Sequence, residues 1–197
     1  MKREYFIGIV TLLSVGGFAK TALGAYPTPC VDMTEEARRS APVGSVCLTS
    51  RGYVFQRITD EAIGAAWVDL ASGVRWMADH QEDVYSNDGG RIENGVIIGS
   101  PADQDCRDSG GRLPSREEFA LAESHGFREV LLGMRKSSPW GSGSLSFWSS
   151  SFHSTDELGY TYSYVFGSYD GCSSCNARTT SVNHHTAVRC VAQVPNE

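Results

Sequence analysis

The stretch Gly110-Gly111-Arg112-Leu113-Pro114-Ser115-Arg116-Glu117-Glu118-Phe119 is the strongest structural signal in this chain of 197 residues. Ser115 and Glu118 form the capping-box pattern, in which a serine hydroxyl and a glutamate carboxylate each bind a backbone N–H at the start of a helix. Leu113 is placed to act as the hydrophobic staple before the cap. An apolar run follows, and His125-Gly126 is typical of a helix end. We therefore predict a helix from Ser115 to about His125.

Another helix is predicted immediately before this stretch. Ser100-Pro101-Ala102-Asp103 combines an N-cap serine with proline at the first helical position. The helix would run to about Asp108 and carry Cys106. A further helical turn is predicted over residues 127–134, and residues 33–39 carry a brief helical pattern.

Short strands are predicted on both sides of these helices, because runs of β-branched and aromatic residues alternate there with glycine-rich turns. They cover residues 46–48, 53–58, 65–70, 74–77, 145–151, 160–166 and 186–192. Residues 79–99 are rich in Asp, Asn and Gly and are predicted to form a long surface loop. The order of strands, then helices, then strands predicts an α+β domain with an antiparallel sheet.

Three segments carry a resemblance to a known family: residues 66–76, residues 110–119, and Phe147-Trp148-Ser149-Ser150-Ser151 together with Ala187-Val188-Arg189-Cys190-Val191. Together they resemble the Lcl C-terminal domain family of bacterial exported domains, over roughly residues 50 to 193. The resemblance implies a C-type-lectin-like fold with antiparallel β-sheets, two or three short helices and disulfide bridges. One departure is Gly111, where the family usually has tryptophan.

The N-terminus has the three-part layout of a secretion signal. Lys2 and Arg3 precede an apolar stretch over residues 6–19 that is too short to span a bilayer, and small residues follow. We expect residues 1–24 to be a signal peptide cleaved before Ala25, residues 25–45 to be an N-terminal extension, and residues 46–197 to be the folded domain. The mature protein would be exported, to the periplasm, the outer surface or the medium, and would have no membrane span.

All six cysteines follow the signal segment, which in an oxidising compartment is most simply explained by three disulfides. Fifteen pairings are open. The local pairs Cys30–Cys47 and Cys172–Cys175 are the simplest, and they leave Cys106 with Cys190. The family resemblance supports this last pair, because a bridge from a helix to the final strand is usual in C-type-lectin-like domains.

The formal net charge of −6 argues against nucleic acid and sulfated glycans as partners, because phosphate and sulfate contacts need clustered Lys and Arg. Loops rich in Ser, Gly and Tyr instead favour recognition by rigid aromatic rings and small hydrogen-bonding residues. We therefore expect a ligand-binding surface in the C-terminal part of the chain. Its candidate residues are Trp140, Tyr160, Tyr162, Tyr169, Asp170, Asn183, His184 and His185.

Metal and redox sites find little support in the sequence. The Glu-Pro-Asn and Trp-Asn-Asp motifs of calcium-dependent sugar binding are absent, and Asp83, Asn87 and Asp88 lack EF-hand spacing. Cys172-Ser173-Ser174-Cys175 lies in a Ser- and Gly-rich loop and is expected to be a structural clip and not a redox pair. Zinc binding by these cysteines with His184 and His185 is disfavoured, because adjacent residues on a strand point to opposite sides. No cofactor is expected.

Three functions stay open at this point. The first is a non-enzymatic recognition module that binds a glycan or an envelope or host-surface protein. The second is a structural component of the cell envelope. The third is an enzyme similar to the formylglycine-generating enzymes, which share the lectin-like fold and an Arg-Leu-Pro stretch. Those enzymes bind copper through a cysteine pair near the C-terminus, where this chain has only Cys190 on the matching strand. No Gly-x-Ser-x-Gly motif is present either, so no catalytic residue is assigned.

Overall fold

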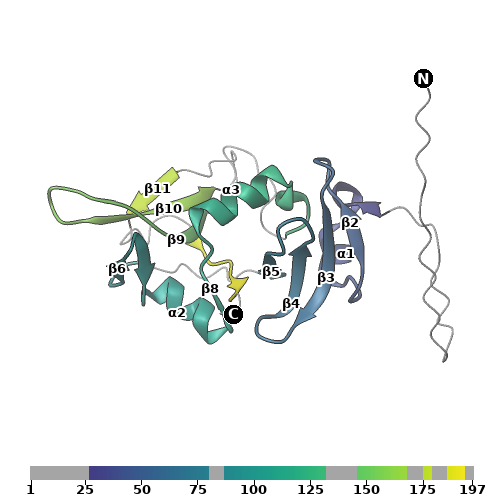
Figure 1. The fold of residues 1–197 in the computed structure, drawn as a ribbon, viewed down its shortest axis with the longest axis horizontal. Coiled ribbons are helices and arrows are strands. Elements are labelled where there is room, and N and C mark those ends of the chain that lie inside the picture. The colour runs from purple at the N-terminus through teal and green to yellow at the C-terminus, as the bar shows by residue number, and fades with distance from the viewer. Residues whose placement is uncertain (1–26, 80–86, 132–145, 168–174, 179–185, 194–197) are drawn as a thin grey trace, which may run out of the picture.

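The computed structural model describes residues 27–79, 87–131, 146–167, 175–178 and 186–193 as an α+β domain built on two sheets. Figure 1 shows β2, β3, β4 and α1 at one end of the molecule, and β6, α2 and the β9–β10 hairpin at the other. Helix α3 lies between these two ends.

The first sheet has seven strands in the order β1-β2-β3-β4-β5-β13-β8. Their bounds are β1 Thr28–Pro29, β2 Val46–Leu48, β3 Val54–Asp60, β4 Gly64–Asp69, β5 Arg75–Met77, β13 Val191–Ala192 and β8 Gly111–Arg112. β1 and β2 pair in parallel, and the other neighbours are antiparallel.

The second sheet has the order β11-β10-β9-β7-β6, and β12 pairs in parallel with β9. Its strands are β11 Cys175–Arg178, β10 Thr161–Gly167, β9 Ser146–Thr155, β7 Val96–Ile98, β6 Arg91–Glu93 and β12 Thr186–Ala187. The sheets are therefore antiparallel in most pairs but mixed overall, which corrects the expectation of purely antiparallel pairing.

The helices are α1 Glu35–Arg39, α2 Pro101–Asp108 and α3 Arg116–Ser124, with 3-10 turns η1 Cys30–Asp32 and η2 Phe127–Glu129. The predicted caps are confirmed. The Ser100 hydroxyl accepts from the Asp103 N–H at 3.1 Å, and Ser115 and Glu118 form both hydrogen bonds of the capping box. Arg112 donates two hydrogen bonds to Glu118, which raise the pKa of its guanidinium.

Residues 87–99 differ from the predicted surface loop, because they include the antiparallel hairpin β6–β7. Its turn, Asn94-Gly95, has positive φ values of 50° and 78° at the two residues. Asn-Gly is the usual pair for a tight hairpin turn because both residues tolerate that conformation. The prediction was wrong because it relied on the polar, glycine-rich composition of this region and did not use the Asn-Gly turn signal between Ile92 and Val96.

The described part of the predicted N-terminal extension, residues 27–45, contacts the rest of the domain through the Cys30–Cys47 disulfide and through Arg38. Its side chain is almost fully buried, with 1% of the residue's surface exposed, and Nη1 donates to the carbonyl oxygens of Met33 and Glu129, both at 3.0 Å. The segment is thus attached to η2 as well as to β2.

The main core is an aromatic cluster beneath α3. Phe119 of α3 stacks on Phe166 of β10 with ring centroids 4.9 Å apart, and Trp76 of β5 meets Phe127 at 5.2 Å. Because these side chains come from both sheets and from α3, their burial holds the three parts together.

A second buried cluster surrounds the disulfide Cys106–Cys190, which links α2 to the residue before β13. Trp148 is fully buried in this cluster. Leu113 also lies here and not in the cluster of Phe119, so it packs against the disulfide instead of stapling α3.

The structure contains Cys30–Cys47 as its other disulfide among the described residues. Cys172 lies outside the described residues, so the pairing predicted for Cys172 and Cys175 stays a prediction. No helix in the described part of the chain is long and apolar enough to cross a membrane.

Asp60 at the end of β3 is a buried carboxylate that organises the turn into β4. Oδ1 accepts the N–H groups of Ala62 and Ile63 at 2.9 and 3.1 Å, and Oδ2 accepts from Arg75 Nη1 at 2.7 Å. Burial alone would raise the pKa of Asp60, but these backbone hydrogen bonds and the Arg75 guanidinium together outweigh it and lower the pKa.

We predict that Asp60→Asn lowers the free energy of unfolding at neutral pH by about 1–3 kcal/mol, because a charge-assisted network is lost. The pKa of Asp60 in the folded protein is below the usual value of 3.8. The ionised carboxylate therefore stabilises the fold fully above pH 3.8, and this stabilisation is lost as the pH falls through the lowered pKa. Urea unfolding across a pH series should show that the difference in unfolding free energy between wild type and variant shrinks below pH 3.8. Glu61→Gln, an exposed neighbour with the same charge change, is the control; a difference that is constant with pH would contradict the assignment.

Candidate functional site

Two of the eight predicted ligand-binding residues, Tyr160 and Tyr162, lie in the described part of the chain. Tyr162 lies on β10, and Tyr160 lies in the turn just before it. The other six lie outside the described residues: Trp140, Tyr169, Asp170, Asn183, His184 and His185. The candidate site among the described residues is therefore the β9–β10 hairpin.

The β9–β10 hairpin extends beyond the rest of the domain, at the left of Figure 1. Its tip, residues 156–160, presents Leu158 with 82% of its surface exposed and Tyr160 with 39% exposed. A single exposed apolar side chain is ordinary on a protein surface; the tip is a candidate site because it presents an apolar and an aromatic side chain together at the end of a projecting element. Leu158 is the most exposed large hydrophobic side chain among the described residues.

Two irregularities interrupt the pairing of β9 with β10. Tyr162 pairs with Ser154 and Ser163 pairs with Phe152, so His153 is an extra residue on β9; a second shift follows between Ser163 and Val165. Such bulges change the direction in which side chains point and are common beside binding sites.

Serine hydroxyl groups satisfy main-chain carbonyls at the second irregularity. The buried Ser163 hydroxyl lies 3.0 Å from the carbonyl oxygen of Ser149, and the Ser149 hydroxyl donates to the carbonyl oxygen of Tyr164 at 2.9 Å. Unpaired buried carbonyls would destabilise the hairpin. The serine-rich composition of β9 therefore has a structural role as well as being typical of recognition loops.

The bulged region gathers an aromatic surface. The His153 and Tyr164 rings meet edge to face at 4.9 Å, and the Arg116 guanidinium lies 4.5 Å from the Tyr164 ring centre. We call His153, Tyr160, Tyr162, Tyr164 and Arg116 the tyrosine surface. Cation–π and aromatic contacts restrict the rings in advance, which lowers the entropy that a ligand must remove on binding.

Asp156 fixes the tip of the hairpin. Its Oδ1 accepts the N–H groups of Leu158 and Tyr160 at 3.0 and 2.9 Å, and its Oδ2 accepts from the Tyr162 hydroxyl at 3.1 Å. An aspartate that accepts nearby backbone N–H groups is a common way to stabilise a tight turn. One carboxylate thus positions both predicted tyrosines.

Tyr164, His153 and Arg116 are members of the tyrosine surface that the sequence prediction omitted. Tyr164 could have been found, since Tyr160, Tyr162 and Tyr164 recur with the period of two that places residues on one side of a strand. His153 and Arg116 could not, because their positions depend on the bulge and on the packing of α3. Among the described residues, no group of three or more His, Cys, Asp or Glu side chains is placed to hold a metal ion.

No protein-family model, curated protein or solved structure matches this chain.

We predict that Asp156→Ala loosens the hairpin tip without disturbing the core. The amides of Leu158 and Tyr160 should exchange with deuterium faster, and the free energy of unfolding should fall by about 1 kcal/mol because three hydrogen bonds are lost at a largely exposed site. Glu157→Ala changes the same charge at an exposed neighbour and should leave exchange unchanged. Equal exchange in the two variants would show that Asp156 does not hold the tip.

Proposed function

We propose that this protein is an exported, non-enzymatic recognition module that binds its ligand through the tyrosine surface, together with the C-terminal residues predicted from the sequence, without an obligatory metal. The observation that carries the proposal is the projecting hairpin, whose exposed Tyr160 and Leu158 are fixed in place by Asp156. Rigid aromatic side chains with a polar end give large contact area at low entropic cost, which suits a recognition surface.

We further propose that the fold is C-type-lectin-like and that the chain is a member of the Lcl C-terminal domain family. Support comes from the α+β architecture with two sheets and from the Cys106–Cys190 disulfide between α2 and the final described strands. The three segments that carry the resemblance form β4 to β5, the start of α3, and the paired strands β9 and β12.

A protein ligand fits the described surface better than a glycan. The tip is a projecting element with an apolar end at Leu158, which suits insertion into a hollow on a partner. The Leu158 side chain offers no hydrogen-bonding group to the hydroxyls of a sugar. An envelope protein or a host-surface protein is thus the first candidate class, and a glycan is the second.

Export is supported by the two disulfides, because such bonds persist in oxidising compartments and are rare in the cytosol. A structural envelope component is the main alternative function, since an exposed apolar tip would also suit a permanent interface with another envelope protein. An enzyme similar to the formylglycine-generating enzymes has no specific support from the described residues.

The proposal is tested by binding to arrays of envelope proteins, host-surface proteins and glycans. We expect the wild type to bind a protein, and the double variant Leu158→Ala/Tyr160→Ala to bind it about tenfold or more weakly, because exposed aromatic and apolar anchors dominate such interfaces. Leu70→Ala/Leu121→Ala is the matched control, since these residues are 52% and 43% exposed elsewhere on the domain. The control should bind like the wild type.

Equal binding by wild type and the tip variant would reject the hairpin as the site. A triple variant, Trp140→Ala/Tyr169→Ala/His184→Ala, then tests the loops separately. Binding seen only on the glycan array would favour the second ligand class. A stoichiometric envelope partner in pull-downs, with no ligand on any array, would favour the structural alternative.

A further inference from the structure

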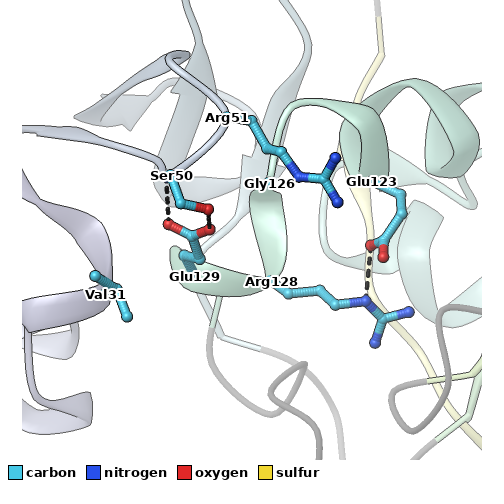
Figure 2. A pocket seen from close by; sticks show the side chains of 7 residues that line it. All are labelled: Val31, Ser50, Arg51, Glu123, Gly126, Arg128 and Glu129. Atoms are coloured by element: carbon cyan, nitrogen blue, oxygen red, sulfur yellow. Dashed lines mark hydrogen bonds and ion pairs between the residues drawn. The ribbon is translucent and has the colours of Figure 1, made fainter.

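A pocket with a volume of about 430 Å³ lies between the β2–β3 turn, the end of α3 and η2 (Figure 2). The volume is in the range of sites that hold small molecules or single side chains of a partner. Four of its lining residues are charged: Arg51, Arg128, Glu123 and Glu129. None of the lining residues belongs to the tyrosine surface, so the pocket is separate from the site proposed above.

The walls of the pocket are fixed by contacts between segments that are distant in sequence. The Ser50 N–H donates to Glu129 Oε2 at 2.8 Å, and the Ser50 hydroxyl donates to the other oxygen of the same carboxylate. The Thr49 hydroxyl donates to the carbonyl oxygen of His125 at 2.8 Å. The turn after β2 is thereby held against the end of α3, so the pocket is formed before any ligand arrives.

Gly126 makes this close approach possible. Its φ is +80°, and a Cβ added to it would lie 3.0 Å from Thr49 Cβ and 3.2 Å from Arg51 Cγ. A side chain at this position would require the turn to shift and would change the pocket. Glycine is therefore favoured here by both backbone conformation and space.

The positive groups of the pocket gather around one carboxylate. Arg128 Nε donates to Glu123 Oε2 at 2.7 Å, and Figure 2 shows the Arg51 guanidinium turned toward Glu123 as well. The charge of Glu123 is thus offset by residues of the protein itself. An added anion would compete with Glu123 for these arginines, so this side of the pocket does not favour an acidic ligand.

Glu129 is the other acidic group, and it has no cation beside it. Both of its carboxylate oxygens accept from Ser50, which is neutral, and no basic side chain in the described part of the chain forms an ion pair with it. An ionised carboxylate offers about four acceptor positions, so about two remain for a ligand. Figure 2 shows this carboxylate between Val31 and the group formed by Glu123 and the arginines.

We propose that the pocket binds a primary ammonium group on an aliphatic chain, with Glu129 accepting from the ammonium and Val31 contacting the chain. An ammonium carries three N–H donors, and its hydrogen bonds to a carboxylate are strengthened by charge. Val31 lines the same pocket and is 57% exposed, so it can cover methylene groups next to the ammonium. The formal net charge of −6 also favours the approach of a cation.

A metal ion fits this position less well than an organic cation. Calcium takes six to eight oxygen ligands, whereas Glu129 is a single carboxylate already bound by Ser50. No group of three or more potential metal ligands of the His, Cys, Asp and Glu types occurs among the residues that the structure describes. This inference does not depend on the proposed recognition function.

The same ammonium group occurs in a free alkylamine and in the lysine side chain of a peptide. The test therefore uses n-pentylamine beside 1-pentanol, and Nα-acetyl-lysine N-methylamide beside its Nε-acetylated form, with the full folded chain at neutral pH. Binding at millimolar concentrations is followed by NMR shifts of the Ser50 and Gly126 amides. We expect both amines to bind, and both neutral compounds to bind about tenfold or more weakly, because the charge-assisted hydrogen bonds are lost.

Glu129→Gln should weaken binding of both amines about tenfold or more, since it removes the charge and keeps the side-chain shape. Glu61→Gln is the matched control, because Glu61 is exposed in the β3–β4 turn and its change of charge is the same. Arg51→Gln should not weaken amine binding, because the Arg51 guanidinium can only repel an ammonium. Weaker amine binding by Arg51→Gln would contradict the assignment.

Val31→Ala tests the aliphatic contact without touching the hydrogen bonds of the wall. It should weaken amine binding about threefold or more because methylene contacts are lost, whereas Val43→Ala, at a valine that is 67% exposed elsewhere, should bind like the wild type. Equal binding by these two variants would overturn the role of Val31. If Glu129→Gln does not fold, the comparison of each amine with its neutral partner on the wild type decides alone.

Tighter binding of the lysine derivative would identify a lysine of a partner protein as the ligand, and equal or tighter binding of pentylamine a small amine. The proposal is overturned by equal binding of amine and neutral compound, by unchanged binding in Glu129→Gln, or by no binding of either amine. None of these results would bear on the tyrosine surface, whose test uses different variants.

Discussion

The two sheets depend on one short segment, residues 186–192, which belongs to both. β12 pairs with the second sheet and β13 with the first, and the Cys106–Cys190 bridge attaches the chain between them to α2. Arg189 is fully buried in this segment and donates to two main-chain carbonyl oxygens at the end of β5. Burial, partly opposed by Asp79, lowers its pKa to about 9, so it still carries its charge at neutral pH. The two carbonyl oxygens and the charge of Asp79 help to keep this charge inside the protein.

The projecting β9–β10 hairpin keeps a defined shape because it is bonded to the start of α3. The stretch that begins α3 is in contact with the base of the hairpin: the Ser150 N–H donates to the carbonyl oxygen of Pro114 at 2.9 Å, and the Arg116 N–H donates to the Ser151 hydroxyl at 3.0 Å. The Arg116 guanidinium then lies over Tyr164. The helix start and the tyrosine surface are thus parts of one hydrogen-bonded unit, and the surface is supported by regular structure at its base.

The sequence predicted what is determined locally. The two helix starts at Ser100 and Ser115 follow from a few adjacent residues, and the structure contains both. Contacts between distant residues were not predictable: the parallel pairing of β1 with β2 and the burial of Arg38 against η2 depend on how the whole chain packs. The candidate site shows the same division. The tyrosines were found by composition, but the bulge that brings His153 to Tyr164 has no sequence signal of its own.

The position of the shared segment in the chain has a kinetic consequence. Because synthesis runs from the N-terminus, residues 186–192 are made after every other described element. Their partners lie far back in the chain: Cys106 is 84 residues before Cys190, and the Arg189 side chain bonds the carbonyl oxygen of Met77 across 112 residues. Contacts of such long range form slowly. The first sheet can start with the nearby Cys30–Cys47 pair, separated by 17 residues, whereas β5 and β8 lack β13 between them until the end. A chain that emerges N-terminus first into the oxidising compartment would therefore expose open strand edges until β13 arrives, a state that favours aggregation and makes assistance by a chaperone valuable.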